Sequence, residues 1–209
     1  DLYQWGRFSD GHQCRTSATT STLSSTDQPA HGDFITINSG NYDWRSPQND
    51  NLWQGVNGIN NPCPSGYRIP TVAELDAERL SWSSNNSAGA IASPLKLPMA
   101  GYRSLSNGSL FSIGAFGRYW SSTVSGALAR YLYFSSSNAT MVDNYRAFGF
   151  SVRCLKIDTF TLSEAEGLIS EAFDLFYPER SFSGVDGLTL KLFVPQGREF
   201  TNNPRSGSV

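Results

Sequence analysis

The segment from residue 62 to residue 74 reads PCPSGYRIPTVAE and carries the strongest local signal in the chain. Its first half is a turn rich in Pro and Gly that leads into a short strand near Tyr67. Thr71 is suited to cap the start of a helix, and Glu74, three residues later, completes a capping box. Apolar residues then recur at roughly helical spacing. We therefore expect a helix over residues 72–81.

Downstream of this helix, the sequence favours an antiparallel β region. Short aromatic or β-branched segments alternate there with Gly, Ser and Asn. Around residue 132, tyrosines alternate with Leu132 and Phe134, so one of these two faces must pack inward. We expect strands at 95–98, 101–103, 117–123, 129–134 and 149–154.

Residues 1–61 are dense in Gly, Asn, Ser, Asp and Trp, with only short apolar runs such as 34–37. This pattern indicates long ordered loops with short strands between them. We expect Trp5, Trp44 and Trp53 to anchor these loops.

The character of the sequence changes near residue 155. The formal charge is −3 over residues 1–100, +4 over 101–154 and −3 over 155–209. An apolar stripe predicts an acidic helix over 162–176, and a strand is expected at 188–194.

Composition excludes several classes of protein. The 209 residues are 39% hydrophobic, which is enough for a sizeable core, and only 16% are charged. The net charge of −2 argues against a global electrostatic grip on nucleic acid, so we expect no nucleic-acid partner. The sequence has no apolar run long enough for a transmembrane segment. Because it starts at Asp1 without Met, we expect a signal or anchor to lie upstream.

Candidate catalytic sets are few. His12 and Cys14 could form a nucleophilic pair, but no third orienting group is evident, so we favour a polar loop with an incidental thiol. Glu74 and Glu78 share a helix face, and we interpret them as ordinary surface carboxylates.

Metal-binding patterns are also weak. The chain has two His and three Cys without a CxxC pair, which does not suit a structural zinc site. In the loops of residues 38–61, oxygen-bearing side chains could bind Ca²⁺, but their spacing differs from an EF-hand, so Asx-turns are favoured and the question stays open. These side chains are Asn41, Asp43, Asn49, Asp50 and Asn51. We expect no metal and no cofactor.

Several motifs in order resemble the Fibrobacter major paralogous domain, a family of the C-type-lectin-like superfamily related to the formylglycine-generating-enzyme fold. The resemblance covers about residues 1–156. The motifs are DLYQWGR at 1–7, GYRIPT at 66–71 with Glu74, GYR at 101–103, YWSST at 119–123 and GFSVRC at 149–154.

The resemblance implies an α+β, C-type-lectin-like fold in which short antiparallel strands and one or two helices support long ordered loops. It implies a ligand-binding domain at 1–156 and leaves 157–209 as an extension of unknown function. The enzyme branch uses two reactive cysteines late in the domain, whereas only Cys154 lies late here, so that activity is not carried over. EPN, QPD and WND motifs are absent, so Ca²⁺-dependent sugar binding is not carried over either.

The sequence is also similar to the variable proteins of diversity-generating retroelements, in which adenine-directed copying errors rewrite codons of a C-terminal cassette. That cassette corresponds to about residues 101–154. Randomised AAC or AAT codons cannot encode Lys, Glu or Gln, and these residues are absent from the cassette although the chain has 3 Lys, 7 Glu and 6 Gln. Aromatic β segments are poor in these residues in any case, so the absence supports the resemblance without proving it.

On this interpretation, a fixed frame carries a variable surface. We expect the frame to comprise glycines at 114, 117, 126 and 149 and a core of Tyr119, Trp120, Tyr133, Phe134, Phe150 and Val152. The predicted contact residues lie between them: Leu105, Asn107, Phe111, Ile113, Ala115, Phe116, Arg118, Ala127, Leu128, Ser135, Thr140, Val142, Asp143, Asn144, Tyr145, Ala147 and Phe148.

Two alternatives stay open for this surface. Phe111, Ile113 and Phe116 either form an exposed apolar contact loop or face the core. Arginines at 118, 130 and 146 either form a positive rim or brace the loops through carboxylates and carbonyls.

Two cysteines lie in the motifs that frame the domain. The resemblance therefore implies that Cys63 and Cys154 are close in space, and in an oxidising compartment we expect a disulfide. Such a bond closes a loop of roughly 90 residues and contributes about 4 kcal/mol.

We predict a non-enzymatic receptor or adhesin that binds an unknown protein or cell-surface ligand, located at a cell surface or on a virion. One alternative is an enzyme of the formylglycine-generating type, which needs a reactive thiol at Cys154 or Cys14. Another is a structural module of a surface lipoprotein or appendage, in which residues 157–209 form the assembly contact.

Overall fold

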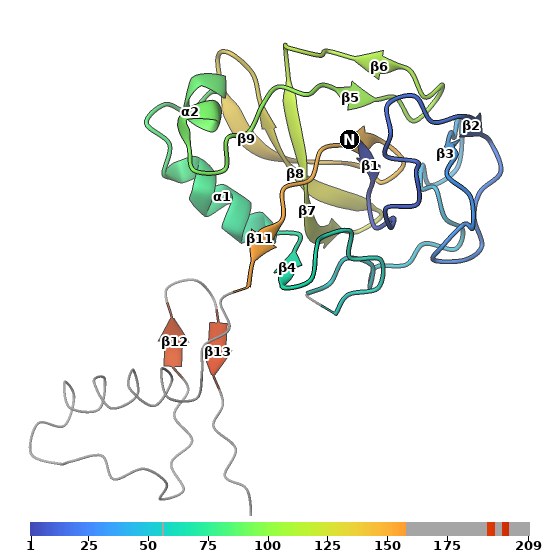
Figure 1. Cartoon of the computed structure of the whole chain (residues 1–209), viewed down its shortest axis with the longest axis horizontal. Helices are drawn as coiled ribbons and strands as arrows, with labels where there is room; N and C mark the ends of the chain where they lie inside the picture. The colour runs from blue at the N-terminus through green and yellow to red at the C-terminus, as the bar shows by residue number, and fades with distance from the viewer. Residues whose placement is uncertain (56, 158–191, 195–197, 201–209) are drawn as a thin grey trace, which may run out of the picture. The chain divides into compact units, whose positions relative to one another are not determined.

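The computed structural model describes residues 1–55, 57–157, 192–194 and 198–200. By its internal contacts the chain divides into two compact units, Asp1–Ile157 and Asp158–Val209. The first unit is α+β: its described residues form two helices and several small, mostly antiparallel sheets (Figure 1).

The largest sheet is three-stranded, with β7 (Gly117–Ser125), β8 (Leu128–Phe134) and β9 (Ala139–Tyr145) in that order. Both pairings are antiparallel. The strands predicted at 117–123 and 129–134 are confirmed. The sequence interpretation missed β9, whose mixed polar composition hides its alternation.

A four-stranded sheet joins the start of the chain to its later part. Its order is β1 (Tyr3–Gln4), β10 (Gly149–Phe150), β5 (Tyr102–Arg103) and β6 (Leu110–Phe111). Each strand pairs antiparallel with its neighbour. Segments that are about 145 residues apart in sequence are therefore hydrogen-bonded side by side, which fixes the loops between them.

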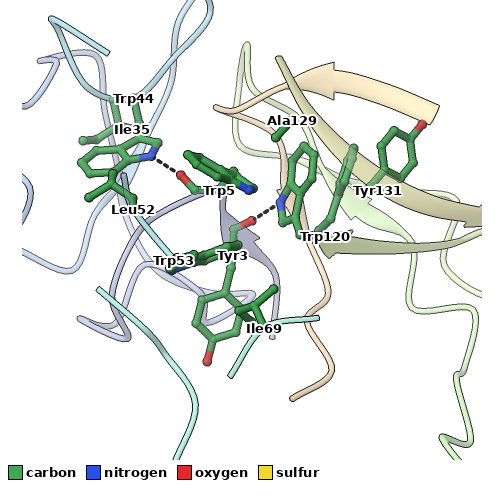
Figure 2. Packing of buried hydrophobic residues seen from close by; sticks show 11 residues of the cluster. Tyr3, Trp5, Ile35, Trp44, Leu52, Trp53, Ile69, Trp120, Ala129 and Tyr131 are labelled. Carbon is green, nitrogen blue, oxygen red and sulfur yellow. Dashed lines mark hydrogen bonds between the residues drawn. The ribbon is translucent and has the colours of Figure 1, made fainter. Parts of the chain in front are cut away.

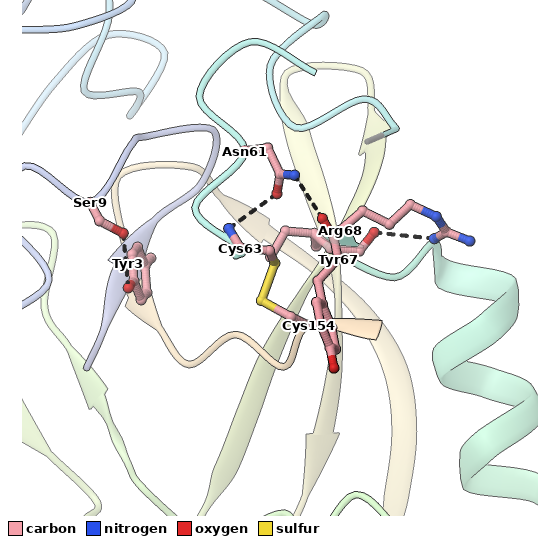
Figure 3. Close-up of a disulfide and its surroundings, with 8 residues drawn as sticks. Tyr3, Ser9, Asn61, Cys63, Tyr67, Arg68 and Cys154 are labelled. Atoms are coloured by element: carbon pink, nitrogen blue, oxygen red, sulfur yellow. Dashed lines mark hydrogen bonds between the residues drawn. A yellow bond between two sulfur atoms is a disulfide. The ribbon is translucent and has the colours of Figure 1, made fainter. Parts of the chain in front are cut away.

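A third pairing lies beside a disulfide. Strand β4 (Tyr67–Arg68) pairs antiparallel with β11 (Leu155–Lys156). Next to it, Cys63 and Cys154 form a disulfide with 5.8 Å between their Cα atoms, as the resemblance implied (Figure 3). The Asn61 side chain accepts a hydrogen bond from the Cys63 backbone N–H and so orders the turn that leads to β4.

Two short pairings complete the described strands. Strands β2 (Thr19–Thr20) and β3 (Phe34–Ile35) run parallel, unlike the others. In the second unit, β12 (Leu192–Val194) pairs antiparallel with β13 (Arg198–Phe200). Strand β12 lies within the segment predicted at 188–194, whereas the helix predicted over 162–176 lies outside the described residues.

Helix α1 (Val72–Leu80) confirms the helix predicted from the opening segment. Thr71 accepts a hydrogen bond from the Glu74 backbone N–H, and the Glu74 carboxylate accepts one from the Thr71 N–H. The same carboxylate pairs with Arg68, and these partners lower the pKa of Glu74 to about 2 despite its partial burial. Glu74 therefore positions the helix.

Helix α2 (Ser87–Ala92) was not predicted. The Asn86 side chain caps it by accepting hydrogen bonds from the backbone N–H groups of Ala88 and Gly89. A six-residue helix of small side chains gives almost no periodic signal, which explains the miss. Neither helix in the described part of the chain has the length and apolar character needed to cross a bilayer.

One of the two clusters of buried hydrophobic residues is rich in tryptophan (Figure 2). Trp5, Trp44 and Trp53 are fully buried, which confirms their expected role as loop anchors. The indole N–H of Trp44 donates to the Trp5 carbonyl at 2.7 Å, and that of Trp120 donates to the Tyr3 carbonyl at 2.9 Å. Long loops are thus fixed by buried rings, and the indole N–H groups of Trp5, Trp44 and Trp120 are hydrogen-bonded.

The opposite face of the three-stranded sheet packs against α1 and α2. Leu132 and Phe134 are fully buried there, with Leu75 from α1 and Ala90 from α2. A Cβ atom on Gly117 would come within 2.0 Å of the Phe134 ring, so this position requires glycine.

Both faces of β8 are therefore covered. The expected frame residues Tyr119, Trp120, Phe134 and Phe150 are confirmed as buried. Tyr133 is half-buried and packs at the edge of the tryptophan-rich core, and so does Val152.

Candidate ligand-binding surface

One face of the three-stranded sheet carries a row of aromatic and neighbouring side chains. Residues that pair directly across antiparallel strands point to the same face. Tyr133 pairs with Arg118 on β7 and with Thr140 on β9. Tyr131 pairs with Trp120 and Val142 in the same way. Arg118, Tyr133, Thr140 and Val142 therefore share the face on which the tryptophan-rich core lies.

Rings from other elements extend this face. Tyr102 on β5 stacks on Phe111 of β6 with 5.6 Å between ring centres. The Tyr102 ring also meets Phe148 edge-on at 5.8 Å, and Phe116 contacts Tyr133 at 5.4 Å. We call these five residues and Arg118 the aromatic patch. Phe111 is 44% exposed and the others are half-buried, so the patch is open to solvent at its surface.

Arg118 lies at the centre of the patch. Its guanidinium carbon is 4.0 Å from the ring centre of Tyr102, 5.2 Å from that of Phe150 and 6.0 Å from that of Phe116. These distances fall within the range of cation–π attraction. Within residues 1–157 the side chain makes no hydrogen bond or ion pair, and its Nε atom is buried without a partner.

The floor of the patch is apolar and rigid. Phe150 is fully buried and contacts Tyr131 at 4.7 Å and Phe148 at 5.6 Å between ring centres. Burial raises the pKa of Tyr131, while the nearby Arg118 guanidinium and the Asn144 amide act to lower it. The Tyr131 hydroxyl therefore stays protonated at neutral pH.

The predicted contact residues divide into groups. Arg118, Thr140, Val142 and Asn144 lie on the patch face of the sheet, by register, and three predicted residues from other elements belong to the patch together with Arg118. These three are Phe111, Phe116 and Phe148. Ile113 is 60% exposed, and the loop residues Asn107, Ala115 and Ala127 are also exposed. For two of the three residues with an open alternative, Phe111 and Ile113, the side chain is exposed and does not face the core.

Six of the predicted contact residues are either buried or lie on the opposite face of the sheet from the patch. Leu105, Ser135 and Ala147 are buried, and so they cannot contact a ligand in this structure. The prediction was wrong for them because each turns inward at the end of a short strand or loop. Strand β9 alternates, so three residues lie on the opposite face of the sheet from Val142. These are Asp143 and Tyr145 on β9 and Leu128, which pairs with Tyr145 from β8; the Tyr145 ring contacts the Tyr42 ring at 4.6 Å in a tilted arrangement.

Two arginines brace the fold and form no rim. Arg146 is 1% exposed, pairs with Asp50 at 2.6 Å and lies 3.8 Å from the Asp43 carboxylate. Arg130 pairs with Asp143 at 2.8 Å on the face opposite the patch. Of the three arginines, only Arg118 keeps the character of a contact residue.

The candidate nucleophilic pair does not assemble. His12 is fully buried, and its Nδ1 bonds to Asp10 at 2.6 Å while its Nε2 accepts from the Gln4 N–H. Burial lowers the pKa of His12 to about 4, so it is neutral at pH 7. Both ring nitrogens are used, and Cys14 is an exposed free thiol without this histidine as a base. The sulfur of Cys154 is held in the disulfide.

The loops of residues 38–61 use their carboxylates internally. Asp43 and Asp50 both face Arg146, and burial raises the pKa of Asp43 to about 6. The Asn49 side chain accepts a hydrogen bond from the Asn51 N–H, which is the favoured Asx-turn. Among the described residues no three His, Cys, Asp or Glu side chains are grouped to hold a metal ion.

The sequence interpretation missed two members of the surface. Tyr102 was assigned only to a family motif, and Tyr133 was assigned to the core. Alternation in 129–134 was the available signal for Tyr133, since it placed that ring opposite the fully buried Leu132 and Phe134. Comparisons of the chain with family models, curated proteins and solved structures found no match.

Proposed function

We propose that this chain is a non-enzymatic ligand-binding protein with a C-type-lectin-like fold, and that the aromatic patch is its contact surface. The observation that carries the proposal is the position of Arg118, a cation that lies against the half-buried rings of Tyr102 and Phe116 and has no carboxylate partner among the described residues. Aromatic residues and arginine are the side chains most enriched where protein partners bind tightly. The expected partner is a protein or cell-surface structure.

The scaffold suits this role because the patch lies on rigid elements. Its rings come from strands β5, β6 and β8 and from the residues directly before β7 and β10, and they rest on the buried Phe150. Rigid rings lose little conformational entropy on binding. Short strands, two helices and long anchored loops support the lectin-like interpretation of residues 1–157.

The enzyme alternative has less support. It needs a reactive thiol, but Cys154 is oxidised, and both ring nitrogens of His12 are bonded to groups other than Cys14. The disulfide also suits an oxidising compartment, which fits a cell surface or virion.

A peptide-display selection on the immobilised full chain tests the proposal. Peptides that are enriched on the wild type should lose affinity for Phe111→Ser and Phe116→Ser. They should keep it for Leu80→Ser and Ile91→Ser, which remove exposed apolar side chains from the helices instead. Loss of affinity in the helix variants together with full affinity in the patch variants would place recognition elsewhere.

A further inference from the structure

Arg118 is exceptional among the arginines of residues 1–157. Each of the others donates a hydrogen bond or forms an ion pair with a carboxylate or carbonyl: Arg7, Arg15, Arg45, Arg68, Arg79, Arg103, Arg130, Arg146 and Arg153. The arginines that stabilise the fold therefore do so through hydrogen bonds or ion pairs, which Arg118 lacks within these residues.

A guanidinium without hydrogen-bond partners has N–H donors that a ligand can use. Its planar fork matches a carboxylate with two parallel hydrogen bonds. At Arg118 the rings of Tyr102 and Phe150 lie against the guanidinium, which reduces its contact with water, and its two terminal nitrogens, unlike the buried Nε, are left for hydrogen bonding. A donor that water reaches poorly gains more from an incoming acceptor than a fully hydrated one does.

The segment of sequence that supplies every residue of the patch is poor in acidic side chains, which favours an acidic ligand. Residues 101–154 carry a formal charge of +4, and their only carboxylate, that of Asp143, pairs with Arg130 on the opposite face of the sheet. An approaching carboxylate therefore meets no competing negative charge in this segment. Opposite charges steer association and select partners.

We propose that Arg118 binds the carboxylate of an acidic side chain on a protein partner, while the surrounding rings of the patch hold an aromatic residue next to it. This inference rests on the proposed function and specifies its ligand as an acidic-aromatic segment. Arg118 supplies charge and a bidentate geometry, and Phe111 and Phe148 supply the apolar contact.

Two short peptides test the inference: acetyl-Phe-Glu-Phe-amide and its counterpart with Gln in place of Glu. Each is titrated into the ¹⁵N-labelled full chain while the Nε–Hε resonance of Arg118 is followed by NMR. The Glu peptide should shift this resonance saturably, and the Gln peptide should bind at least tenfold more weakly. Arg118→Gln should reduce the affinity for the Glu peptide to that for the Gln peptide.

Matched variants control for folding and for charge. Arg130→Gln removes an arginine whose side chain is already paired, so it should leave the affinity unchanged. Arg118→Lys keeps the charge but loses the fork, so it should give an intermediate affinity.

Failure of the inference and failure of the proposed function give different results. Equal affinity for both peptides, with shifts in the patch, would overturn the role of Arg118 but leave the patch as the binding surface. If neither peptide shifts the Arg118 resonance, the acidic-aromatic ligand is wrong. The display selection on the patch variants then decides the proposed function separately.

Discussion

The guanidinium of Arg118 lies 4.0 Å from the Tyr102 ring centre, and within residues 1–157 no carboxylate pairs with it. Arg146 offers a contrast, because its guanidinium lies 4.7 Å from the Trp5 ring centre yet pairs with Asp50 and faces Asp43. Both guanidinium groups lie against an aromatic ring, but carboxylates pair with Arg146 and none pairs with Arg118 among the described residues. This difference separates a structural brace from a recognition group.

Replacing the buried Arg146 should lower the free energy of unfolding far more than replacing Arg130, which forms a half-exposed ion pair. Arg146→Met leaves the buried Asp43 carboxylate without its counter-charge, so we expect a loss of about 3–5 kcal/mol in the free energy of unfolding. Arg130→Met breaks a half-exposed pair and should cost about 1 kcal/mol or less. Urea denaturation measures both values. Equal losses would show that Arg146 does not brace the fold.

The disulfide should contribute strongly to stability. Cys63 and Cys154 are 91 residues apart, so Cys63→Ser should lower the free energy of unfolding by about 4 kcal/mol through the loop entropy of the unfolded chain. Cys14→Ser is the matched control, since its thiol is free and exposed, and it should change little. An unchanged denaturation midpoint for Cys63→Ser under non-reducing conditions would contradict this prediction.

Two buried groups give opposing pH dependences. The pKa of His12 falls from 6.5 to about 4 on folding, so protonation at acid pH favours the unfolded chain and stability falls as the pH drops below about 6.5. The pKa of Asp43 rises from 3.8 to about 6, so its protonation favours the folded chain and stability rises as the pH drops below about 6. The two effects nearly cancel between pH 6.5 and pH 5.

Asp43→Asn should remove this cancellation. We expect its free energy of unfolding to fall by about 1–2 kcal/mol more than that of the wild type between pH 6.5 and pH 5. Asp50→Asn is the matched control, because it also removes an oxygen that pairs with Arg146 but from an exposed carboxylate. Parallel profiles for Asp43→Asn and the wild type in urea titrations would rule out buried ionisation at Asp43.

The diversification hypothesis makes a genomic prediction. Sequencing beside this gene should find a reverse-transcriptase gene and an imperfect repeat of the coding region for residues 101–154 that differs from it only at adenines. Those differences should fall in codons of exposed or half-buried residues such as Phe111, Phe116 and Thr140. Adenine differences in the codons of Trp120 and Phe134 would contradict it, because these side chains are fully buried.

Local signals in the sequence predicted the parts of the fold that depend on local chemistry. The capping box at Thr71 and Glu74 predicted α1, and the aromatic strands at 117–123 and 129–134 formed as expected. The burial of Trp5, Trp44 and Trp53 followed from the scarcity of other apolar residues in long loops. For α1 and the β7–β8 hairpin the deciding interactions join residues that are close in sequence, whereas the tryptophans are buried by contacts between distant segments.

The candidate surface was only partly predictable because it depends on register. A shift of one residue along a strand moves a side chain to the other face of the sheet. The sequence did not reveal β9 as a strand, so Asp143 and Tyr145 were grouped with Val142, which faces the opposite way. The burial of Ala147 and the lack of a carboxylate partner for Arg118 in the described part of the chain depend on residues that are distant in sequence, which no local pattern specifies.

One measurement tests the central claim most directly. A peptide enriched by display selection is titrated into the ¹⁵N-labelled full chain, and backbone and Arg Nε–Hε shifts are mapped onto residues 1–157. The account predicts that the largest shifts cluster on Phe111, Phe116, Arg118, Tyr133 and Phe148. Shifts that cluster on α1 and α2, or that spread over both faces of the β7–β8–β9 sheet, would contradict it.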